Sequence, residues 1–259
     1  AASLVLAHAG APAEDIDLFV KGAVPESERP NVLIVMDNTA NWNTAFANEK
    51  SALVSLMAKL PVDKFNVGLM MFTESGGGNG DPKGNYVRAA VRTMNATNKT
   101  NYEELFASLD NNNDKGDRAN FGLAMAEAYR YFSGTTAYAG HNKVKRDHAG
   151  NSVAGYPASN AVYALSDNAF TSAASTTYVS PVSGGCQKNF IVFISNGASD
   201  IGENSGDEVN NLLAAAGGNT TEIPLSPNGR QKIVSDEWAR FLANSDVNSS
   251  IAGAQPVVT

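Results

Sequence analysis

The order of predicted elements indicates an α/β fold with a doubly wound, mostly parallel sheet flanked by helices. Two apolar runs, residues 31–36 and 188–195, have the continuous hydrophobicity of strands buried on both faces. Segments with helical periodicity lie between the strands, as in βαβ units. A polar loop beginning at Asp37 follows the first run, at the sheet edge where open α/β folds place their binding sites.

The first half of the chain predicts one β-α unit followed by a hairpin and two helices. Residues 44–60 carry apolar side chains on one helical face. Residues 65–72 and 86–94 have strand patterns and are separated by a glycine-rich turn, which predicts a β-hairpin. Helices are expected at 102–109 and 121–132, where they would cover the sheet.

The second half begins with a segment that has no clear period. Residues 133–185 are rich in small polar residues and too long for an ordinary loop, so we expect an insertion on the surface. Order resumes with the strand at 188–195, followed by helices at 208–216 and 231–243. Residues 255–259 have the pattern of a half strand, which predicts a domain that is incomplete at its C-terminus.

Two groups of residues within the 133–185 segment are candidates for binding. His141 and His148 enclose Lys143, Lys145 and Arg146, which would suit a metal or anion site, although a solvated loop is the favoured interpretation. Tyrosine offers contact area at low entropic cost, so tyrosines in the segment either bind a partner or pin the segment to the domain. These are Tyr138, Tyr156, Tyr163 and Tyr178.

Composition excludes several classes of partner. The net charge of −7 and the pI near 5.0 argue against nucleic acid or an anionic membrane surface as the main partner. The longest apolar stretches fall far short of the roughly 20 residues that a membrane-spanning helix needs. The small-residue-rich N-terminus suits the remnant of a secretion signal, so residues 1–29 are expected to form an N-terminal extension and 30–259 the domain.

An enzymatic function is not expected. Asp37-Asn38-Thr39 resembles the aspartate-nucleophile loop of haloacid-dehalogenase-like phosphatases, but that chemistry needs a second aspartate where Thr39 stands. The sequence has no Gly-x-Ser-x-Gly elbow and no phosphate-binding loop, and three histidines leave little for a catalytic triad or zinc site. The single cysteine, Cys186, has no partner for a disulfide within this sequence.

Three stretches carry a resemblance to a known family. The Asp37-x-Thr39-x-Asn41 loop, the 120–132 helix and the run Cys186-Gln-Lys-Asn-Phe-Ile-Val-Phe-Ile-Ser-Asn-Gly197 resemble the von Willebrand factor A domain of PilY-type pilus proteins. Asp15-Ile-Asp-Leu-Phe-Val20, upstream of the first strand, is similar as well. The resemblance covers roughly residues 14–259 and is most specific at the Cys-Gln-Lys-Asn-Phe stretch.

This resemblance implies a type IV pilus biogenesis factor and tip-associated adhesin that is exported to the cell surface. Its expected partners are minor pilins or the pilus tip complex, together with a host or surface ligand. Family members usually continue into a large β-propeller. The alternative is a structural pilus component that docks on minor pilins without binding a ligand or metal.

The resemblance also implies a metal-dependent adhesion site for Mg²⁺ or Ca²⁺, in which Asp37 and Thr39 match the family pattern. Asn41 replaces a hydroxyl ligand, Ala119 falls where a threonine belongs, and Asn196 stands where a carboxylate is usual. Hard divalent cations are held mainly by anionic oxygen, so losing one carboxylate predicts a weak or vestigial site. The alternative is that Asp37 caps the following turn.

A second acidic cluster spans residues 110–117. Its oxygen-bearing side chains alternate as in a calcium-binding loop. However, the cluster lacks glycine at the sixth position and has Phe121 where glutamate is needed at the twelfth. We therefore expect a polar turn between two helices.

Overall fold

A computed structural model describes residues 24–38, 43–74, 79, 84–116, 120–195, 206–224 and 234–259. In this part of the chain, five strands form one sheet in the order β3-β2-β1-β4-β5. The strands are β1 (Asn31–Met36), β2 (Asn66–Phe72), β3 (Asn85–Thr93), β4 (Asn189–Ile194) and β5 (Val257–Val258). β3 is antiparallel to β2 and the other neighbours are parallel, which confirms the doubly wound, mostly parallel sheet.

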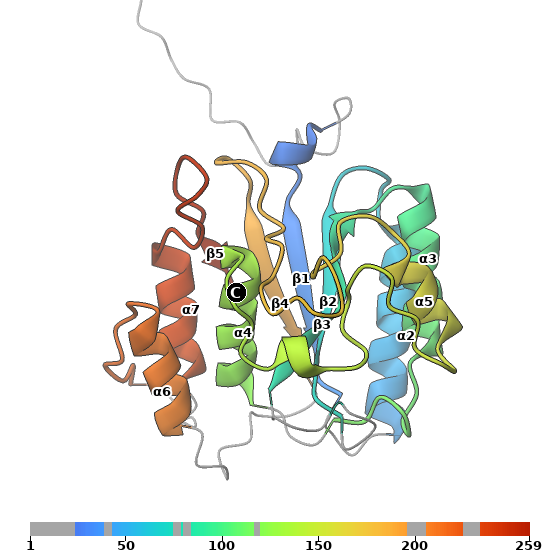
Figure 1. Cartoon of the computed structure of the whole chain (residues 1–259), viewed down its shortest axis with the longest axis horizontal. Helices are drawn as coiled ribbons and strands as arrows, with labels where there is room; N and C mark the ends of the chain where they lie inside the picture. The colour runs from blue at the N-terminus through green and yellow to red at the C-terminus, as the bar shows by residue number, and fades with distance from the viewer. Residues whose placement is uncertain are drawn as a thin grey trace, which may run out of the picture.

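Helices cover both faces of the sheet (Figure 1). Helices α2, α3 and α5 lie on one side, and α4, α6 and α7 lie on the other. Their bounds, with those of the 3₁₀ helices η1 and η2, are η1 (Glu26–Glu28), α2 (Asn43–Lys59), α3 (Ala96–Ser108), α4 (Phe121–Ser133), η2 (Gly140–Asn142), α5 (Pro157–Tyr163), α6 (Gly206–Ala215) and α7 (Ser235–Asn244). None of the helices described is long and apolar enough to cross a membrane.

The central strand β1 is buried on both faces because its alternate side chains enter different cores. Leu33 and Val35 belong to the core beneath α4, α6 and α7. Ile34 and Met36 belong to the core beneath α2, α3 and α5. This two-sided burial explains why the sequence of β1 is continuously apolar instead of alternating.

Most of the predicted elements are confirmed, including the hairpin of β2 and β3. The glycine-rich turn of the hairpin, residues 15–20 and the start of the helix predicted at 231–243 lie outside the described residues. The prediction of a surface insertion at 133–185 is wrong for a large part of that segment. It contains α5, and Val162, Phe170 and Tyr178 are buried in the two cores.

Three asparagines lock the register of the central strands at their amino ends. Asn31 pairs with Asn66 and Asn189 in the parallel ladders, and all three side chains are buried. The Nδ2 of Asn31 donates to Oδ1 of Asn189 (2.9 Å), and Nδ2 of Asn66 donates to Oδ1 of Asn31 (2.8 Å). Gln187 also donates to Oδ1 of Asn31 (3.3 Å). A slip of one residue in either ladder would break the hydrogen bonds between these buried side chains.

The substitution Asn31→Leu should therefore destabilise the fold by about 3 kcal/mol, because the buried Nδ2 of Asn66 and Oδ1 of Asn189 lose the hydrogen-bond partners that Asn31 provides. Urea denaturation monitored by circular dichroism measures this loss. The exposed Asn112→Ala variant is the control and should shift the free energy of unfolding by no more than about 0.5 kcal/mol. Equal stability of the two variants would show that the asparagine pairs do not hold the register.

Candidate functional site

The candidate site begins at Asp37, directly after β1. Its backbone N–H donates to the carbonyl of Ile194 (2.8 Å), which extends the β1–β4 ladder by one residue. The Asp37 side chain is 5% exposed, and Oδ2 accepts a hydrogen bond from Oγ of Ser195 (2.7 Å). The site lies between the carboxyl ends of β1 and β4, where the strand order reverses, and this is the switch point at which doubly wound sheets bind ligands.

Ser195 is a site residue that the sequence reasoning missed. Met36 pairs with Ile194, so the residues that follow the two strands, Asp37 and Ser195, come to lie opposite each other. Its neighbour Asn196 was expected as a ligand from the sequence, but only the strand register shows that Ser195 lies against Asp37. Thr39, Asn41 and Asn196, together with Ala119, lie outside the described residues.

Glu49 brings a second carboxyl group toward this edge from α2. Burial and the nearby negative charge of Asp37 raise the pKa of Glu49 to about 7. The side chain is 9% exposed. Asp37, Glu49 and Ser195 offer only oxygen donors, which is the ligand type that Mg²⁺ and Ca²⁺ prefer. No group of three or more His, Cys, Asp or Glu side chains placed to hold a metal occurs within the described ranges.

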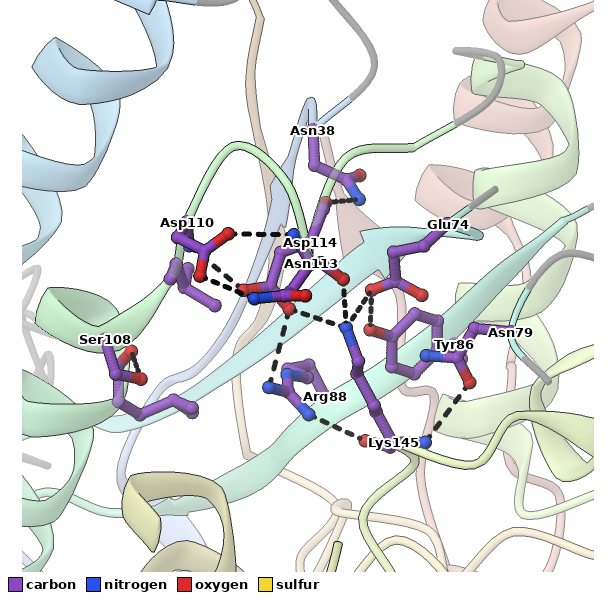
Figure 2. A network of polar contacts seen from close by, with 12 residues as sticks. Asn38, Glu74, Asn79, Tyr86, Arg88, Ser108, Asp110, Asn113, Asp114 and Lys145 are labelled. Atoms are coloured by element: carbon purple, nitrogen blue, oxygen red, sulfur yellow. Dashed lines mark hydrogen bonds and ion pairs between the residues drawn. The ribbon is translucent and has the colours of Figure 1, made fainter. Parts of the chain in front are cut away.

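Asn38 connects β1 to its surroundings through its buried side chain. Its Nδ2 donates to the carbonyls of Phe72 (2.9 Å) and Asp114 (2.7 Å), and its Oδ1 accepts from the Phe72 N–H (2.8 Å). The backbone carbonyl of Asn38 accepts from Gly116. One side chain thus joins the ends of β1 and β2 to the turn at residues 110–116 (Figure 2).

That turn is stabilised by its own side chains. Asp110 Oδ1 accepts from the backbone N–H groups of Asn112 and Asn113 (both 2.8 Å), and Oδ2 accepts from the Asn113 amide (2.9 Å). Partial burial would raise the pKa of Asp110, but these hydrogen bonds lower it overall. The polar turn expected here is confirmed for residues 110–116, whereas Asp117 lies outside the described residues.

A buried charge network lies beneath the turn (Figure 2). The Nζ of Lys145 reaches between Asp114 (2.9 Å from Oδ1) and Glu74 (3.8 Å from Oε1). Arg88, which is fully buried in β3, approaches Asp114 at 3.6 Å. The Tyr86 hydroxyl donates to Glu74. Two cations and two carboxyl groups are thereby matched inside the domain, which offsets much of the cost of removing them from water.

The solvated-loop interpretation of residues 141–148 is wrong for three of its members. Lys143, Lys145 and His148 are 0%, 6% and 7% exposed. Lys145 pairs with Asp114 and Glu74, and Asp147 in the same segment accepts two hydrogen bonds from the Arg92 guanidinium (2.7 and 3.0 Å). The expected surface segment is instead anchored to the sheet through charged side chains.

Two of the four tyrosines pin the segment to the domain. Tyr163 donates to the Lys145 carbonyl and accepts from Arg88 (2.7 Å). Tyr178 is buried, and its hydroxyl donates to Glu127 (2.6 Å). Burial raises the pKa of Glu127, against the opposing effect of this hydrogen bond. These contacts support the pinning alternative for both side chains.

Comparison with known proteins gives a weak structural similarity. No protein-family model matches the chain, and no match was found among curated proteins. Among solved structures, the chain is similar to proximal thread matrix protein 1 from the mussel byssus, described as having a zinc-occupied MIDAS motif. The TM-score is 0.35 and the identity 8%, with 73% of this chain and 36% of that one covered. The chain thus spans about a third of that protein's length.

Removing the central cation of the network should be costly. Lys145→Met leaves Asp114 and Glu74 buried without their closest cation, so we expect a loss of about 3–5 kcal/mol in the free energy of unfolding. Chemical denaturation measures the loss, and the exposed Lys115→Met variant is the control. If the two variants are equally stable, the network does not anchor the segment. Adding Glu74→Gln to Lys145→Met should restore part of the loss, because Glu74 is the buried carboxyl group whose ion pair with Lys145 has been removed, whereas Asp114 still pairs with Arg88.

The raised pKa of Glu49 predicts a pH-dependent stability. The cost of ionising Glu49 in the folded state is absent below its unfolded value of 4.5 and complete above about 7. Glu49→Gln should therefore match the parent protein at pH 4 and exceed its stability at pH 8 by about 1 kcal/mol, since solvent screens part of the effect. Thermal denaturation at both pH values tests this, with exposed Glu104→Gln as the control for lost charge. A stability difference between Glu49→Gln and the parent protein that is the same at pH 4 and pH 8 would contradict this prediction.

Proposed function

We propose that this protein is a von Willebrand A-like binding module that acts as a tip-associated adhesin and biogenesis factor of a type IV pilus. The observation that carries the proposal is the position of Asp37. A buried carboxylate with a hydrogen-bonded serine lies at the switch point of a doubly wound sheet, where the family resemblance implies an adhesion site. The run from Cys186 into β4 supports the pilus assignment through its resemblance to PilY-type proteins.

The proposed metal site uses Asp37 and Thr39, with Asn41 and Asn196 as neutral oxygen donors and Ser195 as an added hydroxyl. A cation bound there would supply positive charge to hold an acidic group of a ligand. Among these residues only Asp37 is anionic, so we expect weak binding, with a dissociation constant of about 1 mM, the upper end of the range for extracellular calcium modules. Glu49 adds negative charge nearby once it is ionised, which should strengthen binding above pH 7.

The proposed partners are minor pilins or the tip complex, with a host or surface ligand bound at the cell exterior. We propose no enzymatic activity, because the loop after β1 has Thr39 where an aspartate-nucleophile phosphatase needs its second aspartate. A purely structural role on minor pilins is the competing outcome of the experiment below.

Calorimetric titration of the protein with Mg²⁺, Ca²⁺ and Mn²⁺ tests the metal site. We expect saturable binding with a dissociation constant of about 1 mM that disappears in Asp37→Ala, since this removes the anionic ligand. Exposed Glu104→Gln on α3 is the matched control and should bind as the parent does. Circular dichroism of each variant confirms that the fold is retained.

The result separates the two pilus roles. Metal binding that depends on Asp37, together with capture of a surface ligand that EDTA abolishes, supports the adhesin. Binding to minor pilins that persists in EDTA and in Asp37→Ala, with no metal bound at about 10 mM, would contradict the adhesion site and leave the structural role.

A further inference from the structure

A second concave site lies beside the carboxyl end of β2, separate from Asp37. It is a pocket of about 570 Å³, within the size range of small-molecule sites. One wall is the turn that carries Asn112 and Asn113, and the other is the segment from Val144 to Tyr156. Both walls are fixed by the buried network described above, because Lys145 Nζ bonds to the Asn113 carbonyl and to Asp114 (Figure 2).

The accessible polar groups of the pocket are mostly neutral. The Asn112 side chain is exposed and makes no hydrogen bond within the described residues. Asn151 donates both amide hydrogens to the Val144 and Arg146 carbonyls (3.0 and 2.8 Å), which leaves its Oδ1 as an acceptor. Ser152 adds an exposed hydroxyl. Together these groups offer donors and acceptors without a net charge.

Apolar surface is interspersed with these groups. Val144 is 43% exposed, and Val153, Ala154 and the ring of Tyr156 complete the lining on the same side. The Tyr156 ring is held by cations, with Lys145 Nζ 4.7 Å and Arg88 Cζ 5.6 Å from its centroid. An aromatic ring fixed in this way is a preformed contact surface with little entropy left to lose on binding.

The charges near the pocket are already matched and argue for a neutral ligand. Lys145 and Arg88 pair with Asp114 and Glu74, and although Glu74 and Lys145 line the pocket, the side chains of all four are at most 8% exposed. Lys115 is the exposed ionisable side chain among the described lining residues. A single solvated lysine contributes little to binding a charged group.

We propose that this pocket binds a neutral sugar residue, such as the hexose unit of a surface glycan. A sugar presents hydroxyl groups that donate and accept hydrogen bonds, and C–H faces that pack on apolar and aromatic surface. The pocket offers both kinds of contact, with Asn112, Asn151 and Ser152 for the hydroxyl groups and Val144 and Tyr156 for the C–H face. This inference goes beyond the adhesin proposal and does not depend on the metal site.

Chemical-shift titration of the ¹⁵N-labelled protein tests the proposal, with the methyl glycosides of glucose, galactose and mannose and with N-acetylglucosamine as probes. We expect at least one probe to bind with a dissociation constant in the range of about 1–10 mM, as suits a small ligand with few contacts. The shifts should map to residues 112–115 and 144–156.

Two variants locate the binding. Val144→Trp fills the pocket from an exposed position and should weaken binding by at least about tenfold. Val62→Trp, at a similarly exposed valine away from the pocket, is its control. Asn112→Ala retains the backbone hydrogen bond to Asp110 and should weaken binding about threefold by removing one polar contact.

The outcomes distinguish this proposal from the metal-dependent one. Sugar binding that survives EDTA and Asp37→Ala but is lost in Val144→Trp supports it, whatever the metal titration gives. Absence of binding by all four probes at about 50 mM would overturn it, as would equal binding by Val144→Trp and Val62→Trp. Binding of N-acetylneuraminic acid alone, lost in Lys115→Ala, would overturn the neutral ligand class.

Discussion

The in-register pairing of β1 with both β2 and β4 is the constraint on which the rest of the structure depends. At the amino ends, Asn31 shares hydrogen bonds with Asn66 and Asn189. At the carboxyl ends, the same register places Asp37 beside Ser195 and Asn38 beside Phe72. A one-residue slip would break the hydrogen bonds of the buried amides. It would also turn each side chain of β1 toward the opposite core, so neither end of the strand can shift independently.

The second determinant of the structure is the matching of buried charge between the sheet and residues 133–185. Arg88 and Arg92 are interior residues of β3, where a cation without a carboxylate would cost several kcal/mol. Their compensation comes from Asp114 and Asp147, on segments that follow later in the chain. The 133–185 segment is therefore a structural part of the domain, because removing it would leave Arg92 without its bidentate partner Asp147.

The sequence alone was sufficient for the strands, the hairpin and most helices because their signals are local. Continuous apolar runs predicted β1 and β4. The polar residues that follow these runs predicted the carboxyl edge of the sheet, where Asp37 lies. The burial of Lys145 was not predictable in this way. Polar neighbours in the sequence predict that a lysine is exposed to solvent. The partners of Lys145, Asp114 and Glu74, lie 31 and 71 positions away in the sequence. Ser195 was missed because only the strand register places it against Asp37.

The two proposed sites share a structural support in Asn38. Asp37 precedes it in the chain, while the Asn38 side chain bonds to the Asp114 carbonyl, in the turn that forms one wall of the pocket. The Nδ2 and Oδ1 atoms of this amide both bond to Phe72 at the carboxyl end of β2, and Nδ2 also bonds to the turn. Because the Asn38 amide is buried and bonds both to β2 and to the turn, it rigidly connects the carboxyl end of β1 to the pocket wall. A ligand in the pocket therefore meets a preformed surface, and its affinity depends on the groups presented there, not on ordering the chain.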